Sequence, residues 1–111
     1  GDCAQVEGMV LQYVAPLLQC ARALAKTLAG ERTQVSYPAM PVVVKTPACP
    51  VVALTPRQKD GVTWRISGDA PDLVAKAHNE AGALIGFALT GAGVKQKMSL
   101  LKEVPALLSV S

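Results

Sequence analysis

The amino-acid sequence predicts an α+β fold with an N-terminal helix, a small antiparallel sheet of four or five strands and a C-terminal helix. Apolar residues recur at helical spacing near both ends of the chain, and β-branched or alternating runs fill the stretch between them. The chain has 111 residues, of which 50% are hydrophobic. Domains usually have roughly 100–150 residues, so this is one domain's worth of sequence with enough apolar residues for a core.

The first helix is predicted over residues 13–29. Its apolar side has the four-three-four spacing of an amphipathic helix that packs on a core. The residues on this side are Leu17, Ala21, Leu24 and Leu28. Pro16 suits the first turn, where its missing N–H would have no partner, and Gly30 suits the position after the last turn. The cations Arg22 and Lys26 argue against a membrane-spanning helix.

Strands are expected after residues 31–40, which are polar and rich in turn-forming residues. Residues 42–44 and 51–52 are runs of valine, and the two prolines between them rule out one unbroken central strand. We therefore expect two short strands with a kink between them.

A hairpin is predicted at Asp60-Gly61, because this pair is typical of two-residue turns between strands. Residues 62–66 follow the turn and alternate strictly between apolar and polar side chains. This alternation predicts that Trp64 faces the core and Arg65 faces water.

A second strand pair is predicted from residues 73–78 and 83–90, joined by a turn at residues 79–82 that contains Asn and Gly. Together the strands predict an antiparallel meander. A second helix follows and continues until Pro105 interrupts it. The apolar positions of that helix are Val94, Met98, Leu101 and Val104 or Leu108.

The charge and the cysteines of the chain exclude several classes of function. Eleven basic and eight acidic residues give a net charge of +3, which is too small and too dispersed for a dedicated nucleic-acid binder. Cys3, Cys20 and Cys49 contain no C-x-x-C pair, so neither a disulfide framework nor a zinc site is indicated. Three unpaired thiols favour a reducing cytoplasm, with one disulfide and one free thiol as the alternative.

No complete active site is visible in the residues themselves. His78, the one histidine, is interpreted as a solvated residue at a strand end. Asp69 and Asp72 flank a proline, where turn capping explains them better than acid–base catalysis. The glycines at residues 91–93 could hold an anion, but they lack a full phosphate-binding motif and favour a plain strand-to-helix turn. These observations predict an accessory or interaction domain.

Four segments resemble the FAD-dependent pyridine-nucleotide reductases. The Gly-Asp-Cys-Ala opening at residues 1–4, followed by the Tyr-Val-Ala-Pro-Leu start of the first helix, is similar to the last flavin-binding segment of that superfamily. Within the superfamily, the Lys-Thr-Pro-Ala-Cys-Pro string at residues 45–50 and the stretch at residues 86–92 resemble the C-terminal region of rubredoxin–NAD(+) reductases. The resemblance spans nearly the whole chain, and the string at residues 45–50 is its most selective part.

The resemblance implies roles for two residues in binding FAD. Asp2 follows the glycine of the Gly-Asp element and would accept a hydrogen bond from a ribityl hydroxyl of FAD. The backbone of Val14 and its neighbours would lie at the pyrimidine edge of the isoalloxazine, because the helix that follows points its N-terminus there. Free amides and the positive end of a helix dipole stabilise negative charge at such a place.

The resemblance also implies rubredoxin as the partner protein. Lys45 is expected near the flavin or the partner, and the alternative is an edge-strand lysine that discourages aggregation. Lys95, Lys97 and Lys102 are candidates for steering an acidic rubredoxin, and the alternative is a solvated helix face.

The expected organisation is a last segment of an FAD-binding domain at residues 1–30 and a C-terminal α+β domain at residues 31–111. No G-x-G-x-x-G motif is present, so the chain alone is expected to be inactive and to bind neither FAD nor NADH. The sequence opens on Gly1 without an initiator Met, which favours a piece of a longer reductase. A free-standing interaction module and a reductase of another small electron carrier, such as ferredoxin, remain the alternatives.

Overall fold

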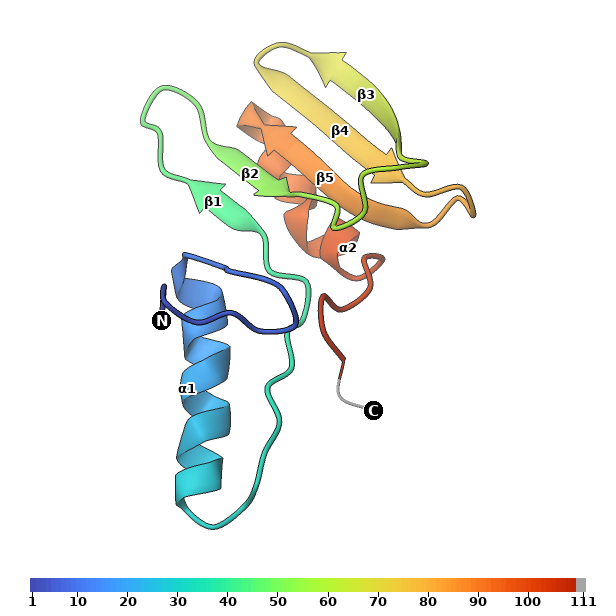
Figure 1. Cartoon of the computed structure of the whole chain (residues 1–111). Coiled ribbons are helices and arrows are strands. Elements are labelled where there is room, and N and C mark those ends of the chain that lie inside the picture. Colours follow the sequence, from blue (N-terminus) through green and yellow to red (C-terminus); the bar gives the residue numbers. More distant parts are fainter. Residues whose placement is uncertain (110–111) are drawn as a thin grey trace. The chain divides into compact units, whose positions relative to one another are not determined.

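The computed structural model describes residues 1–109 and has the predicted α+β composition (Figure 1). The chain divides into two units. The helical unit contains Gly1–Met40 and the described residues from Ala106 onward, and the sheet unit is Pro41–Pro105. No helix among residues 1–109 is long and apolar enough to cross a membrane.

The helix of the first unit, α1, covers Val14–Leu28, which confirms the predicted element. Pro16 lies in its first turn. Gly30 ends the helix with a φ of 104°, a left-handed conformation that glycine adopts without steric cost. The Gly30 N–H donates to the Thr27 carbonyl at 3.1 Å and the Glu31 N–H donates to the Lys26 carbonyl at 2.9 Å. These two bonds form a Schellman cap, which satisfies carbonyls that the helix itself leaves free.

The apolar side of α1 does not face a core within the described chain, so that prediction is wrong here. Leu17, Leu24 and Leu28 are 46%, 58% and 79% exposed. The helix instead buries Pro16 and Ala23. The periodicity of the sequence identified an apolar side correctly, but periodicity carries no information about which polypeptide covers it.

A tyrosine anchors the segment that returns from α1. Tyr37 is 3% exposed, and it exchanges two backbone hydrogen bonds with Leu108 at 2.8 and 3.0 Å. Its hydroxyl lies 3.1 Å from the Cys20 Sγ on α1, and the Tyr13 hydroxyl donates to the Met40 carbonyl at 2.9 Å. The contact with the Cys20 thiol, together with burial, raises the pKa of Tyr37 to about 12.

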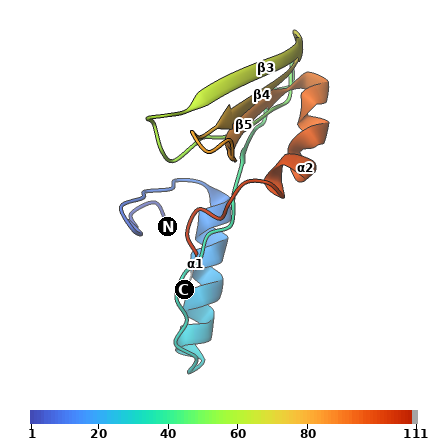
Figure 2. The same cartoon turned by 90° about the vertical axis from the view of Figure 1, so that its right-hand side faces the viewer.

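The second unit contains one five-stranded antiparallel sheet with the strand order β1-β2-β5-β4-β3. Its strands are β1 (Val42–Val44), β2 (Val51–Leu54), β3 (Thr63–Asp69), β4 (Asp72–His78) and β5 (Leu84–Thr90). A 3₁₀ helix, η1 (Gly91–Gln96), continues into the short helix α2 (Lys97–Leu101), and these helices cover one face of the sheet (Figure 2). The second strand pair and the two short valine strands are confirmed.

The strand order corrects two predictions. Strands β3, β4 and β5 form a meander, but β2 pairs with β5 and not with its successor β3. Asp60-Gly61 is a turn that does not join paired strands, because the segment after β2 leaves the ladder. Pro56 has no N–H to donate, and this segment passes so close to β5 that a Cβ on Gly86 would lie 2.7 Å from the Pro56 ring.

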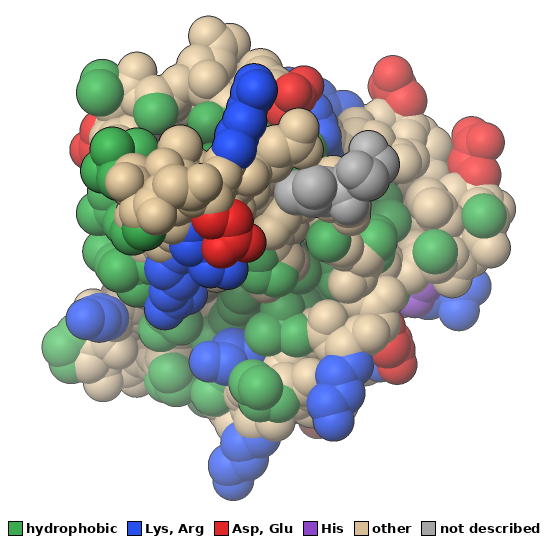
Figure 3. Space-filling model, turned by 90° about the horizontal axis from the view of Figure 1, so that it is seen from below, with side chains coloured by type: hydrophobic (Ala, Val, Ile, Leu, Met, Phe, Trp, Pro, Cys, Tyr) green, Lys and Arg blue, Asp and Glu red, His purple; other side chains and the backbone are tan. Residues whose placement is uncertain are grey.

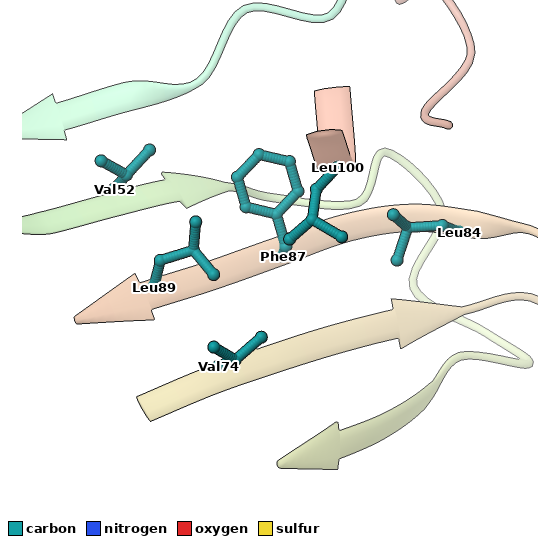
Figure 4. Close-up of a cluster of buried hydrophobic side chains, with 6 residues drawn as sticks. All are labelled: Val52, Val74, Leu84, Phe87, Leu89 and Leu100. Carbon is teal, nitrogen blue, oxygen red and sulfur yellow. The ribbon is translucent and has the colours of Figure 1, made fainter. Parts of the chain in front are cut away.

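The core of the sheet unit lies between the sheet and α2. Its buried members are Val52, Val74, Leu84, Phe87, Leu89 and Leu100 (Figure 4). The pairing shifts where Ala77 opposes Gly86 and His78 opposes Leu84, so Ile85 is the extra residue of a bulge. This bulge places Leu84 on the same face as Phe87.

The second helix is shorter than predicted. It ends at Leu101, before Pro105, and begins as a 3₁₀ helix. Leu101 packs against the core as expected, whereas Met98 is 64% exposed. Helical spacing assumes 3.6 residues per turn, and the tighter 3₁₀ turn shifts the residues that follow it.

Trp64 does not face the core, which corrects the prediction from alternation. It pairs with Ala77, whereas Arg65 pairs with Lys76 and therefore lies on the face that carries Val74 and α2. The apolar residues of β3 thus point to the opposite face of the sheet, called the open face here. Its larger apolar members and alanines are Val42, Val44, Val51, Ala53, Trp64, Ile66, Leu73, Ala75, Ala77 and Ala88.

The open face is apolar and accessible in the described structure. Ile66 is 71% exposed, Trp64 is 47% exposed and Val42 is 42% exposed. Ala77 at one end of the face is fully buried, so only part of the face is accessible. None of the strand residues on this face carries a charge. Hydrophobic side chains also reach the surface among lysines and arginines in the view of Figure 3.

The raised pKa of Tyr37 predicts how stability depends on alkaline pH. The pKa is about 12 in the folded state and about 10 in an unfolded chain, so the stability it contributes is full below pH 10 and is lost as the pH rises toward 12. Chemical denaturation between pH 8 and 12 should show this loss in the wild type and a smaller loss in Tyr37→Phe. A tyrosine absorbance titration in which Tyr37 ionises near pH 10 would contradict it.

Candidate functional site

The N-terminal segment presents Asp2 at the surface. The Ala4 N–H donates to the Gly1 carbonyl at 3.0 Å, and Val6 and Met9 exchange two hydrogen bonds of 2.9 Å. Gly8, with a φ of 77°, allows the tight reversal between them. These turns shape the segment before α1 and leave the Asp2 carboxylate exposed, so it is accessible to a hydroxyl donor.

The start of α1 offers backbone donors without a cap. Tyr13 is the N-cap residue, it makes no capping hydrogen bond with its side chain, and the first turn contains no acidic residue. Val14 is 65% exposed. The first N–H groups of a helix have no partner within the helix, and the helix dipole makes this end positive. The start of α1 can therefore donate hydrogen bonds to a carbonyl oxygen or to a negatively charged group. Pro16 in the first turn has no N–H, so it adds no donor that lacks a partner.

Lys45 begins the loop between β1 and β2. It is exposed and follows the edge strand β1 directly, which also fits the interpretation as a protective edge lysine. Thr46 Oγ1 donates to the Cys49 carbonyl and the Thr46 N–H donates to the Val44 carbonyl at 3.0 Å. The side chain of Cys49 is half-buried. The Lys-Thr-Pro-Ala-Cys-Pro string thus folds as an internally bonded loop.

A hydrogen-bond network joins this loop to the turns at the same end of the sheet. The Gly91 N–H donates to the Pro50 carbonyl at 3.0 Å. The Asp72 carboxylate accepts the Ala92 N–H at 2.8 Å, and Thr90 Oγ1 donates to the Pro71 carbonyl at 2.6 Å. The loop after Lys45 therefore lies beside the start of η1.

The network explains residues whose roles sequence reasoning missed. Asp72 was interpreted as a turn cap, but its carboxylate bonds Ala92, which is twenty residues away. A Cβ on Gly91 would overlap that carboxylate and would lie 2.8 Å from the Pro71 carbonyl oxygen. The Gly91 position therefore favours the plain strand-to-helix turn, because the Ala92 amide already has an acceptor. The long sequence separation left no local signal for this pairing.

The three helix lysines lie on η1, on α2 and just after it. Lys95 and Lys102 are exposed, and Lys97 is half-buried. Within residues 1–109, none of them forms an ion pair. Asp2 and Val14 belong to the helical unit, whereas Lys45 and the helix lysines belong to the sheet unit. The candidate residues therefore form two groups, one in each unit.

Other polar features add no catalytic centre. His78 is half-buried, not fully solvated, and its Nδ1 is buried without a hydrogen-bond partner in the described chain. No group of three or more potential metal ligands occurs among residues 1–109. A groove of about 370 Å³ beside α1 carries Arg22 and Lys26, which sequence reasoning did not select as site residues.

Comparison with known proteins identifies close relatives. Rubredoxin-NAD(+) reductases of Alcanivorax borkumensis and Acinetobacter baylyi are 52% and 50% identical to this chain over 108 and 109 residues. Each alignment covers 97% of this chain and 28% of the relative. A nitric oxide reductase FlRd-NAD(+) reductase of Aliivibrio fischeri is 42% identical over 104 residues, which is 94% of this chain and 27% of the relative.

The chain thus spans little more than a quarter of the length of these relatives. Residues 34–104, which include the whole sheet, η1 and α2, match the family described as the rubredoxin binding C-terminal domain. The resemblance found in the sequence is confirmed, and the chain belongs to the family of rubredoxin-binding C-terminal domains.

Proposed function

We propose that this chain is the C-terminal portion of an FAD-dependent reductase that passes electrons from NADH to rubredoxin. The family match over residues 34–104 carries this proposal, and the names of the two relatives that are 52% and 50% identical support it. The isolated chain is inactive in this proposal, because it lacks the Gly-rich motifs that hold dinucleotides. We assign the intact enzyme to the cytoplasm, which the three free cysteines support.

Two exposed apolar surfaces support the view that further polypeptide covers this chain in the intact enzyme. One is the open face of the sheet, and the other is the side of α1 that carries Leu17, Leu24 and Leu28. Large contiguous apolar patches are rare on monomeric proteins and usually mark interfaces. A neighbouring domain of the same polypeptide accounts for both surfaces.

The helical unit fits a role in holding FAD. When bound, FAD supplies the ability to take a hydride and to release single electrons. Asp2 would accept a hydrogen bond from a ribityl hydroxyl, for which its carboxylate is exposed. The first amides of α1 would donate to the pyrimidine edge, for which the helix has neither a side-chain cap nor an acidic first turn.

The sheet unit fits a role in binding the electron carrier. Lys45, Lys95, Lys97 and Lys102 are proposed as partner-binding residues, and Lys45 as a residue near the flavin as well. Rubredoxins, as a family, are small acidic proteins. Opposite charges accelerate the encounter of redox partners. The absence of ion pairs to the three helix lysines within residues 1–109 leaves these cations available for a partner.

A second candidate is a reductase of another small electron carrier. The relative from Aliivibrio fischeri, which is 42% identical and is named for nitric oxide reductase FlRd, favours this alternative. A stand-alone interaction module without activity is the remaining candidate, and it requires neither Asp2 nor the start of α1 to meet a flavin.

The FAD assignment predicts the effect of Asp2→Ala in the intact reductase. Loss of a hydrogen bond to a charged group costs about 1.5–3 kcal/mol, so the Kd for FAD should rise roughly ten- to hundredfold. The Kd is measured by titrating the apoenzyme with FAD while flavin fluorescence is recorded. Asp60→Ala removes an exposed carboxylate from the sheet unit and is the matched control; equal affinities in both variants would contradict the assignment.

A charged substitution on the open face should change the stability of the intact reductase more than the stability of this chain. Ile66→Asp should change the unfolding free energy of this chain by less than about 0.5 kcal/mol, because the side chain is mostly exposed. In the intact reductase it should cost about 1–3 kcal/mol, because a carboxylate replaces a buried side chain. Urea denaturation of both proteins measures this. Thr63→Asp, on the other face of β3, is the control. Equally small effects of Ile66→Asp in this chain and in the intact reductase would contradict the proposal that another domain covers the open face.

The helix lysines predict an effect that depends on salt. Changing Lys95, Lys97 and Lys102 to Gln in the intact reductase should slow the second-order reduction of rubredoxin about tenfold at low ionic strength. The difference should shrink in high salt because exposed charges are then screened. Stopped-flow spectroscopy measures the rate, with Arg32→Gln as the control. Rates that respond to neither the mutations nor the salt would exclude steering by these lysines.

A further inference from the structure

The segment that follows α1 turns back and runs beside the helix within the helical unit (Figure 1). A groove of about 370 Å³ lies between the two, and the buried Ala23 of α1 is among its lining residues. A side chain as small as that of Ala23 leaves this space open. Sites for small molecules have volumes of roughly 300–1,000 Å³, so the groove has room for a small ligand.

The groove is held in shape by contacts at both ends of the returning segment. The Thr33 N–H donates to Thr27 Oγ1 of α1 at 3.1 Å. Further along the segment, the Tyr37 hydroxyl lies 3.1 Å from the Cys20 Sγ of the same helix. The short stretch between these two anchors lines the groove. A preformed site has little ordering cost when a ligand binds, so this groove suits binding.

The lining of the groove carries positive charge and no negative charge. Arg22 and Lys26 lie about one turn apart on α1 and both line the groove, whereas no Asp or Glu does. Neither cation forms an ion pair within residues 1–109. A cleft lined by charges of one sign concentrates their field and attracts the opposite charge. The groove therefore favours an anion.

Neutral polar side chains complete the lining. Gln19 belongs to α1, and Gln34 and Ser36 belong to the returning segment. Their side chains make no hydrogen bond within the part of the chain that the structure describes. Amide and hydroxyl groups donate hydrogen bonds, so these residues can contact the oxygens of a bound anion.

The charge of the lining indicates which anion fits. A phosphate group carries a charge of about −1.5 to −2 at pH 7, which two cations balance. The Arg22 guanidinium can bind two phosphate oxygens at once, and the Lys26 ammonium acts as a point charge. Lys26 lies in the last turn of α1, where a cation also offsets the helix dipole without any ligand. Arg22 lies one turn earlier, so the dipole does not explain it.

We propose that the groove beside α1 binds the phosphate group of a small molecule, with Arg22 and Lys26 as the charged contacts and Ser36 as a neutral donor. The group belongs either to inorganic phosphate or to a phosphate monoester, because both present the same oxygens to the groove. The inference goes beyond the proposed function and does not depend on which carrier the reductase serves.

The test is a titration of this chain, labelled with ¹⁵N, at constant ionic strength. The ligands are inorganic phosphate, adenosine monophosphate and adenosine, and binding is followed by the shifts of backbone and side-chain amide signals. Phosphate and adenosine monophosphate should shift the Thr33 and Gln34 signals saturably, whereas adenosine should shift neither. Adenosine monophosphate that binds at least about fivefold more tightly than phosphate identifies a monoester as the ligand, and equal affinities identify inorganic phosphate.

Charge-neutral variants test the two cations. Arg22→Gln and Lys26→Gln should each weaken phosphate binding at least about fivefold, and Gln is compatible with the helix. Lys59→Gln makes the same charge change at an exposed position of the sheet unit and should weaken binding by less than about twofold. The proposal is overturned if both groove variants bind like Lys59→Gln, if adenosine binds as tightly as its monophosphate, or if phosphate produces no saturable shift.

The intact reductase shows whether the groove is available in the whole enzyme. With FAD bound, calorimetric titration with phosphate should give at least about fivefold weaker binding to Arg22→Gln than to the wild type. Equal affinities, or no binding to the wild type, would overturn the proposal, because the rest of the polypeptide would then occupy the groove.

Discussion

The packing of Leu100 of α2 on Phe87 of β5 determines which face of the sheet is closed. Because strand neighbours alternate between the two faces, this contact and the register assign every other side chain of the sheet to one side or the other. Val52 and Leu89 join the core, whereas Trp64 and Ile66 are left on the open face. The bulge at Ile85 is needed to bring Leu84 to the closed side.

This division separates the two kinds of contact that a C-terminal reductase domain makes in the proposed function. The uncharged open face suits a lasting contact with the rest of the polypeptide, for which desolvated charges are unfavourable. The lysines of η1 and α2 lie on the other side, which the proposed carrier would approach. The loop at residues 45–50 is held at the end of the sheet by the bond from Gly91 to Pro50.

The sequence predicted the elements well where local chemistry decides them. Gly30 and Pro16 bound α1 because a Schellman cap and a donor-free first turn depend on single residues. The prediction that Trp64 faces the core was wrong, because alternation identifies the apolar face of a strand without identifying what packs against that face. The pairing of β2 with β5 and the hydrogen bond from the Ala92 N–H to the Asp72 carboxylate were not predicted, because both join segments far apart in the sequence.

The candidate site was predictable only in part, for a similar reason. Asp2, Val14 and Lys45 were selected through resemblance, since nothing in their immediate surroundings marks them as functional. The structure adds that Asp2 is exposed and that α1 begins without a cap, two properties that no residue pattern displays. The groove beside α1 was absent from the sequence-based selection because only the folded chain brings Gln34 and Ser36 beside the cations of the helix.

Amide hydrogen exchange on the intact reductase, with and without FAD, tests the central claim most directly. In the proposed function, the start of α1 donates hydrogen bonds to the flavin. FAD should slow exchange of the Val14 and Ala15 amides by at least about tenfold, since a hydrogen-bonded amide exchanges only when its bond opens. The amides at the last turn of α1 should exchange at the same rate in both states. Unchanged exchange at Val14 and Ala15 in an enzyme saturated with FAD would contradict the account.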